Sequence, residues 1–401
     1  MLPGISARSG RTTKGARTFN TFGDKNNEYV QKRPALVFSN GYGGLGSGLI
    51  DSPAGLFSIW EGAVITDGNG FSDVFAEGTI TEITFAGWDN LFITGTSDDG
   101  TTFCGYARNT TTSRIQALKF TETTLTVLSA PTGVTGAYYA YGISGDGNVV
   151  VGGGVVAATA AVRACKWVDT TVSTITTATS AWPEGGAFAA NSDGSVICGH
   201  VLNSGVMRGF IQSNGSVSIL PLLASPYGSN LYLYAVSSDG SHVGGKARNS
   251  GTANQDAILY AVSGGTVYIP DPGAVITGIS QNGALSCGIY LSGESFYYTK
   301  GGATTAINAS GTSVAWAYAI SKYGNEVIGE VTTALGTIQL FRWNAVSGMH
   351  LLGRIAATGT GTGPAIGTTS PKGAGASSMG SVNVITQFSG VNRTAAIWKP
   401  D

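Results

Sequence analysis

Charged residues are scarce in this chain of 401 residues: Asp, Glu, Lys and Arg together make up 11%, against a usual share of about 25%. Histidine occurs three times, and neither H-E-x-x-H nor C-x-x-C is present, so no zinc motif is found. No stretch reaches the roughly 18 consecutive apolar residues of a membrane span. The opening residues also lack the apolar run of a secretory signal peptide. We therefore expect no cofactor, no metal site, no membrane insertion and no export signal.

Cysteine is also rare, with four residues in the chain. Cys104, Cys198 and Cys287 occupy the same place in an internal repeat, each directly before a glycine, while Cys165 stands elsewhere in its repeat. Equivalent positions in different repeats usually lie too far apart for a disulfide. We therefore expect small buried thiols rather than disulfides or metal ligands.

Glycine, by contrast, is abundant, with 61 residues, and hydrophobic residues reach 42%. Thr, Ser, Val and Ile dominate, and the Ala/Leu/Glu/Lys runs of helical proteins are absent. This composition supplies a sizeable core and favours strands joined by tight turns.

A short phrase recurs along the chain, as in "TSDDGTTFCG" at 96–105 and "GISGDGNVVVGG" at 142–153. The glycines that mark it are Gly100, Gly147, Gly194, Gly240, Gly283, Gly324 and, more weakly, Gly380, at intervals of 41 to 56 residues. In six copies a second glycine follows five residues later, whereas the last copy has Ile385 there. A repeat of this length is typical of propeller blades, and the shorter coils of a β-solenoid fit it less well.

The residues at these turns are predicted to be structural. Asp-Gly or Asn-Gly between apolar runs indicates a two-residue hairpin turn in which both residues take positive φ. The predicted turn residues are Asp99, Gly100, Asp146, Gly147, Asp193, Gly194, Asp239, Gly240, Asn282, Gly283 and Gly324. A ring of calcium-binding or catalytic carboxylates is the alternative. It is disfavoured because later copies have Asn282, Tyr323 and Met379 at this place.

Each repeat also predicts a third strand, which in most copies ends in an aromatic residue, such as "ACKW" at 164–167. A short fourth segment follows, as in "VSTI" at 172–175. Four antiparallel strands in about 40–50 residues make one propeller blade. We therefore predict an all-β protein with a seven-bladed β-propeller, eight blades being possible because 55–75 alternates well enough to add strands. The last repeat lacks its fourth strand, and "GTITEIT" at 78–84 is predicted to supply it and close the ring.

The predicted organisation has three parts: a basic extended arm at 1–34, a Gly-rich crossing with a leading β segment at 35–77, and the propeller at 78–401. Residues 1–33 hold seven basic and two acidic residues, a net charge of +5, so the remainder carries −6. Arg8, Arg11, Lys14 and Arg17 are the candidate docking residues of this arm. They suit an acidic partner or nucleic acid, and a solvated tail is the alternative.

Aromatic residues gather in "AYYAYG" at 137–142, "SPYGSNLYLY" at 225–234 and "SFYYT" at 295–299. Exposed tyrosines beside Ser and Asn suit carbohydrate binding. Alternating aromatic residues within a propeller more often pack between blades, and we expect packing here.

Two resemblances extend this prediction. The unit S-x-D-G-x-x-x-x-G … A-x-x-W, across 96–398, resembles the short extracellular repeats of bacterial surface proteins. The segment 31–69 resembles the opening of nozzle, or head-completion, proteins of short-tailed phages. Its parts are Lys32-Arg33-Pro34, the glycines 41–48, the strand Leu56–Trp60 and a hairpin at 61–68.

The second resemblance implies a structural virion protein rather than an enzyme. Such proteins form a hexameric ring below the portal and adaptor, contact fibres or tailspikes, and let DNA pass without specific binding. The virion tail is then the expected location. A secreted or surface adhesion propeller that binds glycan or protein is the first alternative. A phage fibre or receptor-binding protein is the second, and propellers in general host many functions. An enzyme such as a glycan hydrolase or lyase is a further alternative, for which no catalytic residues can be named.

Overall fold

β-strands are the regular elements throughout the part of the chain that the structure, a computed structural model, describes. The described residues are 64–66, 72–74, 79–156, 162–175, 184–203, 205–227, 230–252, 254–307, 314–332, 338–353, 383–389 and 392–399. The predicted arm with its four basic residues, most of 35–77 and the turn at Gly380 lie outside these ranges. Within them there is no helix, and hence none that could cross a membrane.

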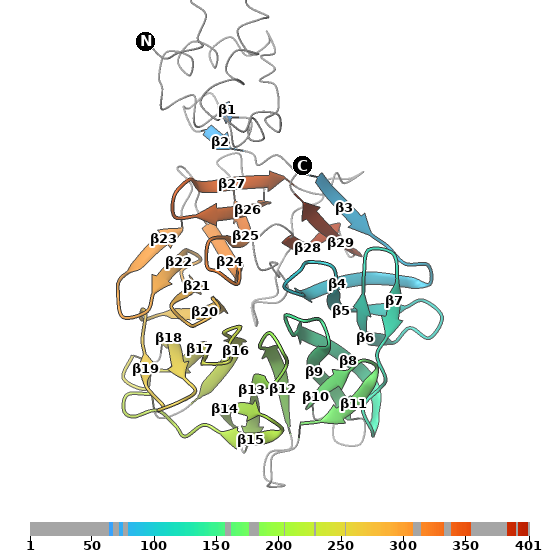
Figure 1. The fold of residues 1–401 in the computed structure, drawn as a ribbon, viewed down its shortest axis with the longest axis horizontal. Coiled ribbons are helices and arrows are strands. Elements are labelled where there is room, and N and C mark those ends of the chain that lie inside the picture. Colours follow the sequence, from blue (N-terminus) through green and yellow to red (C-terminus); the bar gives the residue numbers. More distant parts are fainter. Residues whose placement is uncertain are drawn as a thin grey trace, which may run out of the picture.

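Six four-stranded antiparallel sheets form the blades of a β-propeller (Figure 1), and their strands pair in chain order. The first two blades are β4 (Trp88–Thr96), β5 (Phe103–Asn109), β6 (Ile115–Phe120), β7 (Leu125–Val127) and β8 (Val134–Ile143), β9 (Val149–Val156), β10 (Val162–Val168), β11 (Thr171–Thr174). The next two are β12 (Glu184–Ala190), β13 (Val196–Asn203), β14 (Val206–Ser213), β15 (Ser216–Ile219) and β16 (Leu231–Val236), β17 (His242–Arg248), β18 (Gln255–Ala261), β19 (Val267–Tyr268). The last two are β20 (Ala274–Ile279), β21 (Leu285–Tyr290), β22 (Ser295–Thr299), β23 (Thr304–Ile307) and β24 (Val314–Ile320), β25 (Val327–Thr332), β26 (Ile338–Asn344), β27 (Gly348–Gly353).

A three-stranded sheet completes the circle of sheets in Figure 1. It consists of β28 (Asn383–Ser389), β29 (Asn392–Lys399) and β3 (Thr79–Ile83). β3 pairs antiparallel with β29, with Ile83 opposite Ala395. The segment expected at 78–84 therefore lies at the outer edge of the last sheet, and strands from the two ends of the described chain share one sheet.

The predicted number of blades is wrong. The sequence predicted seven four-stranded blades, with eight possible, whereas six sheets formed by the described residues have four strands. The last repeat has Ile385 in place of the second glycine and contributes two described strands, β28 and β29. That glycine is what lets the first two strands of a complete blade pair closely, as shown below. Residues 55–75 supply no blade in the described part: β1 (Val64–Thr66) and β2 (Ser72–Val74) form a separate hairpin, and β2 contacts β27.

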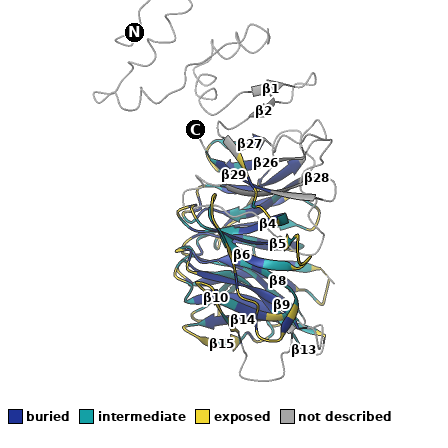
Figure 2. Ribbon diagram, turned by 90° about the vertical axis from the view of Figure 1, so that its right-hand side faces the viewer, coloured by how far each residue is buried: buried dark blue, intermediate teal, exposed yellow. Residues whose placement is uncertain are grey.

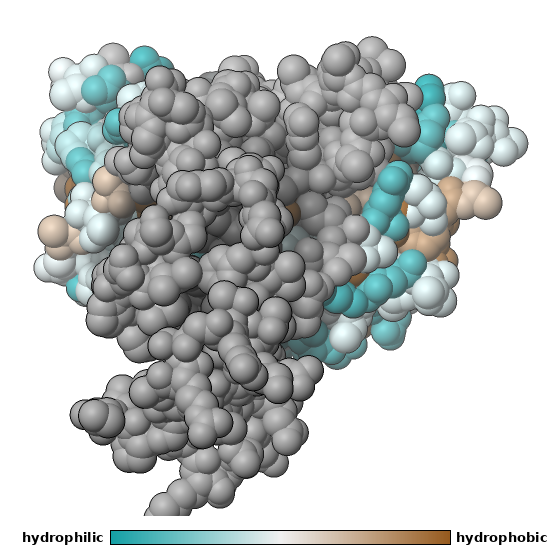
Figure 3. All heavy atoms as spheres, turned by 90° about the horizontal axis from the view of Figure 1, so that it is seen from above, coloured by the Kyte–Doolittle hydropathy of each residue, from teal (hydrophilic) through white to brown (hydrophobic). Residues whose placement is uncertain are grey.

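Neighbouring blades pack face to face. One buried cluster joins Cys104 and Ala117 of the first blade to Val150 and Trp167 of the second, and further clusters join other neighbouring blades. Burial of these apolar faces is the main stabilising contribution. Figure 2 shows buried strands with exposed residues mostly in the connections, and in Figure 3 the described surface mixes hydrophilic and hydrophobic residues.

The turns between the first and second strands differ from the predicted type. Gly100 takes φ of 70°, as its repeat equivalents do, but the preceding Asp99 does not. Instead the Asp99 carboxylate accepts hydrogen bonds from Ser97 Oγ at 2.5 Å and from the Thr101 amide at 3.0 Å. The Ser97 hydroxyl in turn accepts from the Thr102 amide at 3.0 Å. The acidic side chain therefore organises a longer turn, because it satisfies backbone donors that would otherwise lack partners.

These bonds also hold the pKa of the turn carboxyls low. The Ser97 hydroxyl lowers the pKa of Asp99, and Ser195 does the same for Asp193. The stabilisation is therefore present above the unfolded pKa of about 3.9 and is lost as the pH falls below it.

Candidate functional site: an axial cavity

A β-bulge interrupts the first strand of every four-stranded blade at the same place. In β4 the register shifts between Ile93 and Gly95, so Thr94 has no partner in β5. The equivalent unpaired residues are Tyr141, Phe188, Tyr234, Thr277 and Tyr318. Each stands six residues before the glycine of its turn. A bulge inserts one extra residue and re-aims its side chain.

The second glycine of the repeat is what accommodates this bulge. A Cβ added at Gly105 would lie 1.9 Å from the carbonyl oxygen of Phe92, and one at Gly152 would lie 1.9 Å from that of Tyr139. The corresponding approaches are 2.1 Å at Gly199, 2.0 Å at Gly245, 2.2 Å at Gly288 and 2.0 Å at Gly329. No side chain fits at such distances from a backbone oxygen. This glycine therefore recurs because the two backbones must approach closely there.

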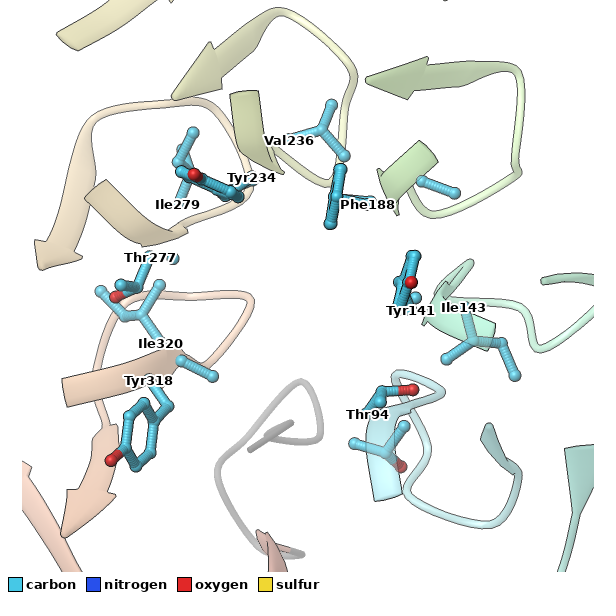
Figure 4. A pocket seen from close by; sticks show the side chains of 18 of the residues that line it. Thr94, Tyr141, Ile143, Phe188, Tyr234, Val236, Thr277, Ile279, Tyr318 and Ile320 are labelled. Carbon is cyan, nitrogen blue, oxygen red and sulfur yellow. The ribbon is translucent and has the colours of Figure 1, made fainter. Parts of the chain in front are cut away.

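The six bulged residues line a cavity on the propeller axis, with a volume of about 210 Å³ (Figure 4). The glycines of the framework are constant in these blades, but the bulged residue is Thr, Tyr, Phe, Tyr, Thr and Tyr in turn. Four of the six are thus aromatic. Because the fold constrains the backbone at this place and leaves the side chain free to vary, this wall is the candidate functional site.

The aromatic residues of the wall contact one another. Tyr141 and Phe188 stack with ring centroids 5.1 Å apart and planes 6° apart, and Phe188 meets Tyr234 edge to face at 5.7 Å. Burial raises the pKa of Tyr141 and of Tyr234, so both hydroxyls stay neutral at physiological pH. The expectation that such residues pack between blades is therefore incomplete, because these rings also face the cavity.

An ion pair lies at the turn end of the cavity. Lys322 Nζ is 2.6 Å from Asp98 Oδ2, which also accepts a hydrogen bond from Ser192 Oγ at 2.8 Å. Backbone hydrogen bonds link the turns around the ring: Asp98 N to Gly145 O, Asp146 N to Ser192 O, Ser192 N to Ser238 O, Asp239 N to Gln281 O and Gln281 N to Lys322 O. The ion pair thus joins the sixth blade to the first across the side where the three-stranded sheet lies.

On the other side of the bulged residues, away from the turns, a cation lies over aromatic rings. Lys246 Nζ is 5.2 Å from the ring centroid of Tyr232 and 5.8 Å from that of Tyr234. His200 packs on Phe188 with ring centroids 4.5 Å apart. Lys246 is half-buried, and within the described ranges no carboxylate forms an ion pair with it. Burial accordingly lowers the pKa of Lys246.

Glu330 is a buried carboxyl group beside the wall. It lies on β25 opposite Trp316 of β24, with 8% of its surface exposed. Burial raises the pKa of Glu330 to about 7, and the neighbouring Tyr318 hydroxyl opposes that rise. The folded protein therefore holds a proton here at pH values where the unfolded chain, with a pKa of about 4.3, has lost it.

Glu330→Gln is expected to raise the free energy of unfolding at pH 8 by roughly 3 kcal/mol and to change it little at pH 4. The sign follows because a raised carboxyl pKa makes the folded state less stable as the pH rises from about 4 to about 7. Urea unfolding of the wild type and of Glu330→Gln at several pH values measures this difference in the free energy of unfolding. Glu294→Gln, at an exposed position, is the control. An equal effect of Glu330→Gln at pH 4 and pH 8 would contradict the assignment.

The residues predicted from the sequence lie around this site rather than in it. The turn aspartates Asp99, Asp146, Asp193 and Asp239 are exposed and hydrogen-bond within their own turns. Asp98, one residue before Asp99, lines the cavity and was missed as a site residue, as were Thr94, Phe188, Thr277 and Tyr318. Tyr141 and Tyr234 lie in the aromatic segments 137–142 and 225–234, which were expected to pack between blades. The sequence feature that could have identified the bulged residues is their constant place, six residues before the turn glycine, combined with a side chain that differs between repeats.

No group of His, Cys, Asp and Glu in the described residues could hold a metal ion. The four cysteines are free and buried, and burial raises the pKa of Cys104 and Cys287 to about 12.

The fold is shared with several solved structures. An oligogalacturonate lyase from Vibrio parahaemolyticus is 12% identical with a TM-score of 0.53, over 84% of this chain and 98% of the lyase. A prolyl endopeptidase is 12% identical with a TM-score of 0.52, over 77% of this chain and 47% of the other. An acylaminoacyl peptidase is 8% identical with a TM-score of 0.51, over 78% and 52%. No protein-family model and no curated protein sequence matches the chain.

These similarities correct one sequence-based expectation. The chain was expected not to be an enzyme, yet its fold is one that a lyase and two peptidases use. The absence of a sequence motif did not justify that exclusion, because catalytic groups can be assembled from distant parts of a chain. At 8% to 12% identity the likeness shows the fold alone, so none of these activities is assigned to this chain.

Proposed function

We propose that this chain is a structural component of the tail of a short-tailed phage and acts in a ring of six copies around a duct for DNA. The observation that carries the proposal is the resemblance of 31–69 to the opening of nozzle proteins. The structure supports it in one respect. β3, which begins at Thr79, is the outer strand of its sheet, so this strand lies at the rim of the propeller, where a neighbouring protein has access.

The geometry of the cavity favours a duct between copies. The cavity measures about 210 Å³, and the Lys322–Asp98 ion pair lies at its turn end. A DNA duplex, whose major groove alone is about 12 Å wide, does not fit there. Copies joined head to tail would enclose a wider passage. The charge of −6 on residues 34–401 suits a wall that does not retain phosphate. Electron microscopy of the purified protein distinguishes six-fold rings from isolated discs, and discs alone would count against the proposal.

The basic arm is proposed to dock on the tail component above the ring. Replacing Arg8, Arg11 and Arg17 together by Gln is expected to reduce the amount of this chain in purified particles at least tenfold (about 1.4 kcal/mol), because the arm loses its attraction to an acidic surface. Thermal unfolding should not change. The matched control replaces three exposed blade arginines, Arg114, Arg163 and Arg248, by Gln. Normal incorporation of the arm variant would refute this assignment.

The aromatic wall of the cavity favours a second function, binding of a glycan. It fits both the adhesion propeller and the receptor-binding virion protein that the sequence left as alternatives. Binding of a sugar by the isolated chain tests it without any need for ring assembly.

A further inference from the structure

The side chains that line the axial cavity identify a class of ligand. We propose that the cavity binds a neutral pyranose sugar, with the sugar ring against the aromatic wall and its hydroxyl groups at the turn end. The proposal rests on the glycan-binding function given above, which it places in this cavity, and it is independent of the tail-ring proposal.

The aromatic wall provides the contact surface for the sugar ring. Tyr141, Phe188 and Tyr234 come from three consecutive blades and all line the cavity (Figure 4). Each of them is half-buried, so part of its surface stays accessible although the three rings pack on one another. A pyranose has apolar faces and polar edges, and aromatic side chains that end in a hydroxyl group suit such a ligand.

Polar side chains lie at the turn end of the same cavity. Lys322 and Ser238 both line it there. A lysine ammonium group carries three N–H donors, and its bond to the Asp98 carboxylate engages one of them. The Ser238 hydroxyl can both donate and accept a hydrogen bond. The turn end therefore offers hydrogen bonds to the hydroxyl groups of a sugar.

The charge of the lining favours a neutral ligand. Among the described residues, the charged side chains that line the cavity are Asp98 and Lys322, and they neutralise each other in an ion pair of 2.6 Å. A charged ligand would be buried without a counter-charge, or it would have to separate this pair, and both are costly. Lys246 is not among the lining residues, so it offers no cation to a ligand in the cavity.

The volume of the cavity limits the ligand to one sugar unit. The cavity measures about 210 Å³. A protein cavity of about 150 Å³ admits benzene, so this one has room for a single six-membered ring with its substituents. An oligosaccharide chain does not fit within it.

The test is isothermal titration of the full chain with D-glucose, D-galactose, D-mannose and D-glucuronate. We expect at least one of the three neutral hexoses to bind at least about tenfold more tightly than glucuronate, whose ring is the same size but carries a charge. Asp98→Asn should remove this preference, because the amide leaves Lys322 without its carboxylate in the cavity. A merely structural ion pair would change the stability but not the order of the sugars.

Tyr234→Leu is expected to weaken binding of the preferred hexose at least about tenfold, because the sugar loses an aromatic contact. Tyr232→Leu is the matched control. Tyr232 lies on the same strand, β16, is also half-buried and stacks on Tyr234, but it does not line the cavity. This control should bind the hexose like the wild type, and thermal unfolding shows whether each variant is folded.

Two kinds of result would overturn the proposal. Hexose binding that Tyr234→Leu and Asp98→Asn both leave unchanged, or glucuronate binding as tight as that of the hexoses, would refute the cavity as the site and leave the glycan-binding function in place. The other is that the folded wild type binds none of the three hexoses. Titration with longer glycans then decides the function separately, since their binding would place it on another surface and its absence would refute it as well.

Discussion

Replacing Gly152 by alanine is expected to lower the free energy of unfolding by about 4 kcal/mol. The added Cβ would lie 1.9 Å from the carbonyl oxygen of Tyr139 and 2.9 Å from its carbonyl carbon. Both are backbone atoms of the paired strand, so they cannot move aside without breaking the ladder between β8 and β9. Urea unfolding followed by circular dichroism measures the loss.

Gly136→Ala is the matched control for this prediction. Gly136 lies on β8, the strand that pairs with the strand of Gly152, β9, and a Cβ there would meet Val155 at 3.5 Å, an ordinary contact. Its cost should stay below about 1 kcal/mol, as for glycine replaced by alanine without a clash. If the two variants unfold at the same urea concentration, the steric explanation of the repeated glycine fails.

Ile83→Asp is expected to destabilise the protein by at least about 4 kcal/mol and to promote its aggregation. Ile83 is 3% exposed and packs in one cluster with Ala395 and Ile397 of β29 and with Leu91 and Ile93 of β4. A carboxylate there is buried without a cation, so β3 is expected to leave the sheet. The edge of β29 then lacks a partner, and an open strand edge pairs with other chains.

Thr84→Asp provides the comparison, since Thr84 is the next residue and is exposed. This variant should unfold within about 0.5 kcal/mol of the wild type. Thermal unfolding of both variants measures the loss of stability, and size-exclusion chromatography measures aggregation. A monomeric Ile83→Asp protein with wild-type stability would show that closure by β3 does not hold the ring together.

The hairpins could be predicted because their causes are local. Ser97, Asp99, Gly100 and Thr102 lie within six residues, and their hydrogen bonds and the positive φ of the glycine need no distant partner. The β-propeller of four-stranded blades followed from the recurrence of such units and is confirmed. The form of the turn was predicted wrongly, because the sequence does not show that the Asp99 carboxylate binds the backbone of its own turn.

The sequence by itself determined where the strands and turns lie, and which glycines the backbone requires. Only the tertiary structure decided how many complete blades form and which residues meet at the axis. Thr94 and Tyr318 line one cavity although more than 200 residues separate them, and Lys322 pairs with Asp98 over a similar separation. The physical reason is that ring closure depends on the packing of every blade on its neighbours, which no local interaction specifies.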